Sequence, residues 1–131
     1  MNVLMLLKPK ETVKYIYDSN TLRQGLEKMR VHGYTAIPVI SEDGKYIGTV
    51  SEGDFLYYLV DLRRNVVTDK EKHKVSDIIR KNFNPAVRID VSMDEVFNRA
   101  VSQNFVPVVD DFGTFIGIVT RQDIIRFFIK K

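Results

Sequence analysis

A seven-residue stretch that occurs twice limits what this chain can fold into more than any other feature. Gly48-Thr49-Val50-Ser51-Glu52-Gly53-Asp54 returns 69 residues later as Gly117-Ile118-Val119-Thr120-Arg121-Gln122-Asp123. Each copy follows a β-rich run and precedes a segment with helical apolar spacing. Both copies are therefore predicted to lie on a strand-to-helix turn, and a fixed internal period indicates two copies of one structural unit.

The repeat extends well beyond this stretch. Identical residues recur at the same offset, and upstream of Pro107 the second copy is two residues shorter than the first. A polar segment rich in Lys and Arg separates the copies. We therefore assign residues 1–61 to repeat 1, residues 62–74 to a linker and residues 75–131 to repeat 2. The identical pairs are Pro38/Pro107, Val39/Val108, Gly44/Gly113, Ile47/Ile116, Gly48/Gly117, Val50/Val119 and Asp54/Asp123.

Local signals predict the order β-α-β-β-α in each copy. Thr21 and Gln24 form a capping-box pattern that starts a helix ending at Gly33, and Ser92 with Glu95 does the same in the second copy. Pro38 cannot donate to a strand ladder, so we expect an edge position or a bulge there. The predicted strands are 12–17, 35–40 and 46–50, then 87–91, 105–109 and 115–119; the other helical segments are 51–61, 75–80 and 120–130.

A unit of this size leaves one face of its sheet uncovered, because its helices pack on the other face. The second copy is the available partner. We therefore expect an α+β (α/β) fold in which two β-α-β-β-α repeats pack sheet to sheet with pseudo-two-fold symmetry. A small ligand would then bind in the cleft between the repeats, beside the strand-to-helix turns.

Composition excludes several classes of function. The chain has no cysteine, which rules out disulfides and thiolate sites and fits a reducing interior, so we expect a cytoplasmic protein. The apolar start at residues 1–7 is too short to span a membrane. A net charge of +3, with acidic and basic residues interspersed, gives no reason to expect nucleic acid as a partner.

The repeated turn combines two kinds of chemistry. A hydroxyl and free N–H groups at a helix N-terminus suit a phosphate, and a carboxylate can accept both hydroxyls of a ribose. The same pairs, Ser51 with Asp54 and Thr120 with Asp123, also have capping-box spacing, so they can serve as caps alone. Arg121 could add a phosphate contact where the first copy has Glu52. We therefore favour the Thr120 turn for anionic groups.

These residues resemble the CBS domain: the apolar-Pro-Val strand, the Gly-x-Val-[Ser/Thr]-x-x-Asp turn and the element order all occur twice. The tandem pair is similar to a Bateman module of the small stand-alone bacterial kind. The resemblance implies an adenine nucleotide (ATP, ADP, AMP or cyclic di-AMP) as regulatory ligand, no required cofactor, a homodimer and an effector protein. It also implies a ligand-binding set: Thr35, Ala36, Ile37, Pro38, Ser51, Asp54, Asn104, Phe105, Val106, Pro107, Thr120, Arg121 and Asp123.

Other candidate motifs carry no chemistry. Asp111-Phe112-Gly113 matches a kinase tripeptide but has none of the accompanying kinase motifs, so we expect a hairpin turn. His32 and His73 lack metal-ligand spacing, and no nucleophile with a base is found. We therefore expect no enzyme, no catalytic residue and no metal site. The alternative to a nucleotide sensor is a ligand-free structural or dimerisation module.

Overall fold

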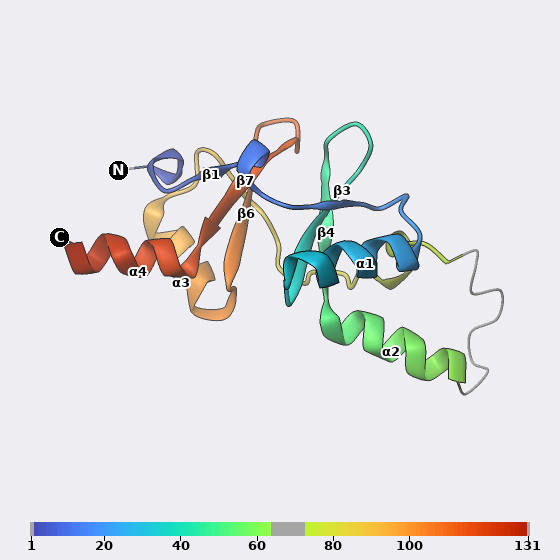
Figure 1. Ribbon diagram of the computed structural model, residues 1–131. Coiled ribbons are helices and arrows are strands. Elements are labelled where there is room, and N and C mark those ends of the chain that lie inside the picture. Colours follow the sequence, from blue (N-terminus) through green and yellow to red (C-terminus); the bar gives the residue numbers. More distant parts are fainter. Residues whose placement is uncertain (1, 64–72, 131) are drawn as a thin grey trace. The chain divides into compact units, whose positions relative to one another are not determined.

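The computed structural model describes residues 2–63 and 73–130, and these form two compact units (Figure 1). The first-repeat unit contains residues 15–43, 47–63 and 73–83. The second-repeat unit contains residues 2–14, 44–46 and 84–130. Most of the predicted linker lies outside the described residues.

The first-repeat unit is built on a three-stranded sheet in the order β2-β3-β4, in which β2 and β3 run parallel. Its core contains Ile16, Met29, Ile37, Val50 and Val75, all fully or almost fully buried. The elements that contribute to this unit are β2 (Ile16–Tyr17), α1 (Leu22–His32), β3 (Ala36–Ile40), β4 (Tyr46–Ser51), α2 (Glu52–Arg63) and the 3-10 helix η4 (Val75–Ile78).

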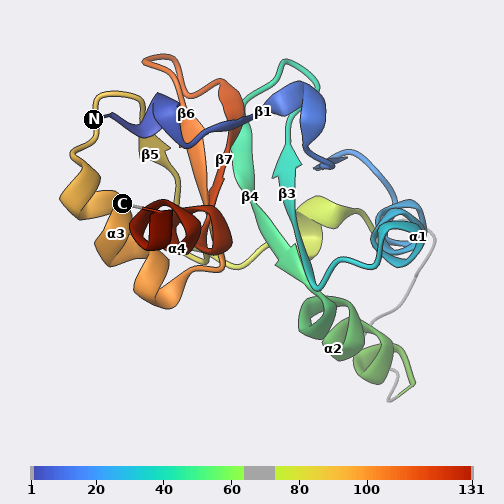
Figure 2. The ribbon, with the colours of Figure 1, turned by 60° about the vertical axis from the view of Figure 1, so that its left-hand side comes forward.

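The second-repeat unit has a four-stranded sheet in the order β1-β7-β6-β5 (Figure 2). α3 packs on β6, α4 packs on β7, and the two helices contact each other. Val3 is buried in the same core as Val96, Val106 and Val119. The elements are η1 (Val3–Met5), β1 (Lys8–Pro9), η2 (Lys10–Thr12), β5 (Val87–Arg88), α3 (Met93–Ser102), β6 (Phe105–Val109), β7 (Phe115–Thr120) and α4 (Arg121–Lys130).

The two units exchange segments relative to the order of the sequence. β1, near the amino terminus, pairs antiparallel with β7, with Lys8 opposite Ile118 and Pro9 opposite Gly117. Conversely, η4 comes after the linker and so belongs to the second repeat by sequence, yet its Val75 is buried in the first-repeat core. Each unit therefore completes its core with a segment that belongs, by position along the chain, to the other sequence repeat.

Most of the local predictions are confirmed. The α+β class and the two-repeat order are as expected. Thr21 and Gln24 form both bonds of the capping box that starts α1, and Gly33 ends it in the left-handed conformation with φ 67°. Residues 110–113 form the expected hairpin turn, in which the Gly113 N–H donates to the Asp110 carbonyl.

Three local predictions are wrong in detail. The first strand is confined to Ile16–Tyr17, which pair with Val39 and Ile40 of β3, and Thr12 belongs to the 3-10 helix Lys10–Thr12 instead. Pro38 lies on the central strand of its sheet; it is tolerated because the short β2 does not extend to it. The strand predicted for residues 87–91 is likewise reduced to Val87–Arg88.

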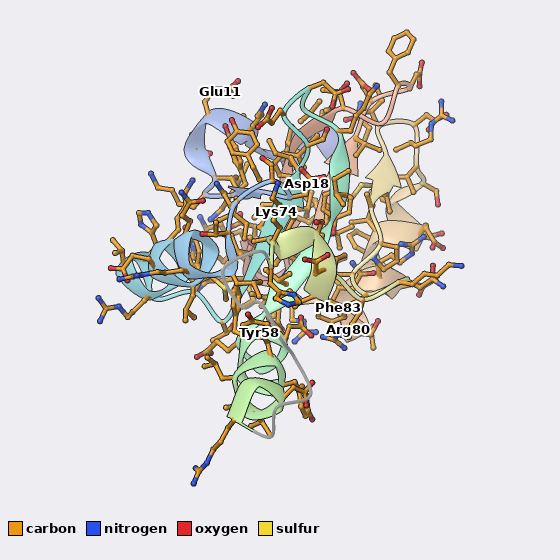
Figure 3. All side chains as sticks on the ribbon, turned by 90° about the vertical axis from the view of Figure 1, so that its right-hand side faces the viewer. Glu11, Asp18, Tyr58, Lys74, Arg80 and Phe83 are labelled. Atoms are coloured by element: carbon orange, nitrogen blue, oxygen red, sulfur yellow. The ribbon has the colours of Figure 1, made fainter. Side chains whose placement is uncertain are left out.

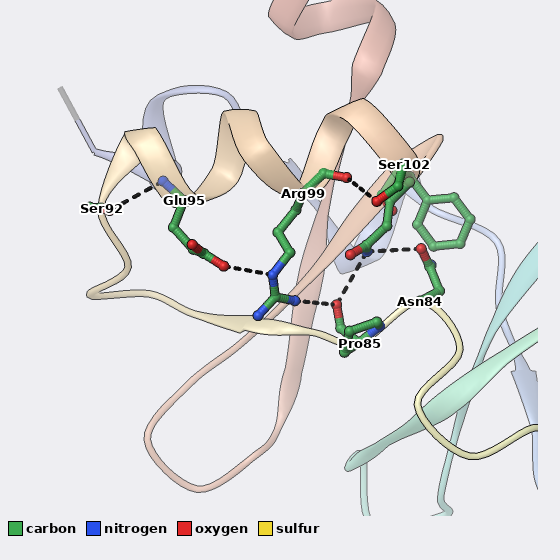
Figure 4. Close-up of polar contacts among 8 residues, drawn as sticks. Asn84, Pro85, Ser92, Glu95, Arg99 and Ser102 are labelled. Carbon is green, nitrogen blue, oxygen red and sulfur yellow. Dashed lines mark hydrogen bonds and ion pairs between the residues drawn. The ribbon is translucent and has the colours of Figure 1, made fainter.

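The expected capping box of α3 is only half formed. Ser92 caps the helix by accepting from the Glu95 N–H at 3.2 Å, but the Glu95 carboxylate accepts from Arg99 Nε at 2.8 Å (Figure 4). Arg99 also donates to the Pro85 carbonyl at 3.3 Å. The glutamate is therefore used to anchor the segment before β5 rather than to complete the cap.

Candidate functional site

The first-copy turn joins β4 to α2 and has a complete reciprocal cap. The Asp54 N–H donates to Ser51 Oγ at 3.3 Å, and the Ser51 N–H donates to Asp54 Oδ2 at 2.8 Å. The Ser51 hydroxyl also donates to Oδ2 at 3.1 Å. Among the residues that the structure describes, Asp54 is the one buried side chain that carries a charge, with 8% of its surface exposed. The predicted hydroxyl and carboxylate therefore lie together at the start of a helix.

Arg80 adds a cation to this turn that the sequence did not indicate. Its Nε donates to Asp54 Oδ1 at 2.8 Å, and its Nη2 lies 3.5 Å from Ser51 Oγ. The Phe83 ring centroid is 3.8 Å from the guanidinium carbon. Figure 3 shows Arg80 and Phe83 side by side, after η4. Because 26 residues separate Arg80 from Asp54, no local pattern could have connected them.

The second-copy turn joins β7 to α4 and is arranged differently. The Asp123 N–H donates to Thr120 Oγ1 at 3.1 Å, as expected for a cap. The Asp123 carboxylate lies 3.6 Å from Lys8 Nζ and 3.8 Å from Arg126 Nη1. Its side chain is 22% exposed, against 7% for that of Asp54. The two aspartates therefore occupy equivalent positions in the repeat but different electrostatic surroundings.

Arg121 is turned toward the end of α3. Its Nε donates to the Ala100 carbonyl at 2.7 Å and its Nη2 to the Val101 carbonyl at 3.2 Å. These carbonyls belong to the last turn of a helix, where carbonyl groups lack intrahelical partners and a cation is favoured. The predicted phosphate contact of Arg121 would compete with this role, so that contact stays a prediction.

The predicted lining residues lie next to the turns in each copy. The Glu52 N–H donates to the Thr35 carbonyl at 2.9 Å, and the Arg121 N–H donates to the Asn104 carbonyl at the same distance. Thr35 and Asn104 are exposed, and Ala36 and Phe105 are partly so. The remaining four, Ile37, Pro38, Val106 and Pro107, are buried. The fold therefore brings turn and lining residues together twice, with the polar lining residues Thr35 and Asn104 accessible to solvent.

The described residues contain neither a cluster of metal-ligating side chains nor a helix that could span a membrane. Within residues 2–63 and 73–130, no group of three His, Asp or Glu side chains is arranged to hold a metal ion. No helix in that part of the chain is long and apolar enough to cross a membrane. His73 lies 3.7 Å from Asp77 and contacts the Tyr58 ring, so its surroundings are those of a packed surface residue.

Comparison with known proteins identifies the family. The family model described as CBS domain matches residues 7–61 and 62–130, so the chain belongs to the CBS-domain family and carries two copies. It is similar to a hypothetical conserved protein of Geobacillus kaustophilus, with 30% identity and a TM-score of 0.87. That match covers 99% of this chain and 97% of the other.

Two similar structures were determined with nucleotides. CbpB of Listeria monocytogenes in complex with c-di-AMP is 26% identical, with a TM-score of 0.85, and the match covers 98% of this chain and 95% of that one. CBSX2 of Arabidopsis thaliana in complex with AMP is 22% identical, with a TM-score of 0.81, and the match covers 98% and 96%. At 22% identity, CBSX2 shows only that the fold is shared.

Proposed function

We propose that this chain is a regulatory module that binds an adenine nucleotide at its strand-to-helix turns and signals the bound state to a partner protein. One observation carries the proposal: in both copies a hydroxyl, an aspartate and an exposed loop residue meet at a helix N-terminus. Such a terminus attracts phosphate, and a carboxylate suits a ribose diol. The complex of the similar protein CbpB with c-di-AMP supports this choice of ligand class.

The ligand is AMP, ADP, ATP or cyclic di-AMP. AMP, ADP and ATP carry a free ribose diol and a terminal phosphate and differ in phosphate number, whereas the 3′ oxygens of cyclic di-AMP are esterified, so each of its riboses offers the turn one 2′ hydroxyl and each of its phosphates is a diester. The role is non-catalytic, as it generally is in CBS-pair proteins, and the protein requires no cofactor. Ordering of the turns by the nucleotide would change the surface that an effector protein reads.

Unpaired apolar side chains support a homodimer. Leu56, Tyr57 and Leu59 of α2 are 59%, 73% and 49% exposed. Ile125 and Phe128 of α4 are 50% and 51% exposed. Apolar groups repeated along a helix favour burial against another molecule. The same faces favour the second candidate, a dimerisation module that binds no ligand and whose turn residues are helix caps only.

Thermal unfolding with and without nucleotides distinguishes the two candidates. A ligand at one hundred times its dissociation constant adds about 2.7 kcal/mol to the free energy of unfolding. We expect a raised melting temperature with at least one of AMP, ADP, ATP and cyclic di-AMP, and none with UMP as a pyrimidine control. A flat response to all four adenine nucleotides would support the dimerisation module.

A further inference from the structure

The guanidinium of Arg80 lies directly on the polar pair of the first-copy turn. We propose that Arg80 is the phosphate-binding residue of this turn and that, without ligand, it is held in place by Asp54. The inference rests on the proposed function, since it assigns a role within the same nucleotide site. In this role, Arg80 would make the first-copy turn bind a nucleotide more tightly than the corresponding nucleoside.

Arg80 has hydrogen-bonding capacity to spare. A guanidinium carries five N–H donors. The bonds to Asp54 and Ser51 use one at Nε and one at Nη2, which leaves three for a ligand. The side chain is 53% exposed, so it can reach a molecule that arrives from solvent. The planar guanidinium can donate two parallel hydrogen bonds to a phosphate, which a lysine ammonium cannot do.

The Asp54 carboxylate is more fully used than the guanidinium. Oδ2 accepts the Ser51 N–H and hydroxyl, and Oδ1 accepts Arg80 Nε. Three of about four acceptor sites are then occupied, so a ribose diol, which brings two donors, would compete with Arg80 at Oδ1. On binding, a ribose hydroxyl would replace Arg80 as the donor to Asp54 Oδ1. The guanidinium would then donate its N–H groups to the phosphate. Phe83, stacked on the guanidinium, keeps it near the turn during this exchange.

The sequence favoured the second-copy turn for phosphate, whereas this assignment favours the first-copy turn. The sequence favoured the Thr120 turn because the first copy has Glu52 in place of Arg121, whereas in the structure Arg80 supplies a positive charge at the first-copy turn. Arg121 was expected to attract phosphate to the second copy, whereas its guanidinium donates to carbonyls at the end of α3. The guanidinium of Arg80 contacts the turn residues Asp54 and Ser51 and is 53% exposed, whereas that of Arg121 is bonded to the end of α3, so we assign phosphate selectivity to the first-copy turn.

Isothermal titration with AMP and with adenosine tests this assignment. The two probes differ only in the phosphate, so the ratio of their affinities reports the phosphate contact. We expect Arg80→Gln to weaken AMP binding at least tenfold while adenosine affinity changes less than threefold. Arg88→Gln is the matched control, because Arg88 pairs with an exposed carboxylate of the second-repeat unit, Asp111. The series is repeated in an Asp123→Ala background, which removes the carboxylate of the second turn.

Arg80→Lys guards against an effect on folding, since it keeps the positive charge beside Asp54. We expect it to lower the AMP-to-adenosine affinity ratio at least threefold, because the planar guanidinium is lost. An unchanged ratio in both Arg80 variants overturns the assignment, as does an equal loss for both probes. Those results would leave the proposed function standing. If the unmodified protein binds none of AMP, ADP, ATP, cyclic di-AMP and adenosine, the proposed function fails and the inference fails with it.

Discussion

Replacing the two repeated aspartates separately should have unequal effects on stability. Asp54→Ala removes bonds to the Ser51 N–H and hydroxyl and to Arg80 Nε, at a side chain that is 7% exposed. A bond to a charged group contributes about 1.5–3 kcal/mol, and the half-exposed Arg80 contributes at the low end. We expect a loss of about 2–3 kcal/mol. Asp123→Ala removes only two long ion pairs to exposed cations and should cost about 0–1 kcal/mol.

Urea unfolding followed by far-ultraviolet circular dichroism measures both losses under one set of conditions. Asp54→Asn serves as a control because it preserves the size of the side chain and removes its charge; its loss should lie between zero and that of Asp54→Ala. The comparison is internal, since both aspartates occupy the same position of the repeat. Equal losses for the two alanine variants would refute the difference in surroundings on which the unequal turns are based.

Three further predictions concern the second-repeat unit. Asp123→Ala should weaken adenine nucleotide binding at least tenfold by titration calorimetry if Asp123 holds ribose, and an unchanged affinity would remove it from the site. Gly117→Ala should lower the free energy of unfolding in urea by about 3 kcal/mol, because a Cβ there would collide with the Lys8 carbonyl. Gly53→Ala is the control, because a Cβ at that position would make only ordinary contacts. Equal losses of stability in the two variants would contradict this argument. The N–H groups of Thr114 and then Phe112 lower the pKa of Asp110, so its stabilisation is complete above about pH 4 and is lost as the pH falls through the lowered pKa. Asp110→Asn should remove the decrease in unfolding free energy over this pH range. If the free energies of the variant and the unmodified protein change in parallel with pH, the prediction is wrong.

Local features of the fold could be predicted from the sequence. The cap at Thr21, the left-handed Gly33 and the turn at Gly113 depend on residues within one helical turn or one hairpin, and all three are confirmed. The turn residues Ser51 and Thr120 likewise cap their helices as their spacing indicated. These signals are reliable because the interacting groups are close along the chain.

Contacts between distant segments could not be predicted. Arg80 reaches Asp54 only because η4 folds onto the first-repeat core, and Lys8 reaches Asp123 only because β1 pairs with β7. Arg121 has the chemistry of a phosphate ligand, but two of its donors go to the carbonyls at the end of α3 rather than to the turn residues. Residue type therefore indicated which chemistry was available, and tertiary packing decided which partner each group has.

A crystal structure of the protein grown with AMP tests the central claim most directly. We expect ribose hydroxyls within about 3 Å of the Asp54 or Asp123 carboxylate. At the first-copy turn, we also expect the phosphate to lie within the same distance of the Arg80 guanidinium. A nucleotide bound away from both turns, with Asp54 still paired to Arg80, would contradict the claim that these turns form the ligand site.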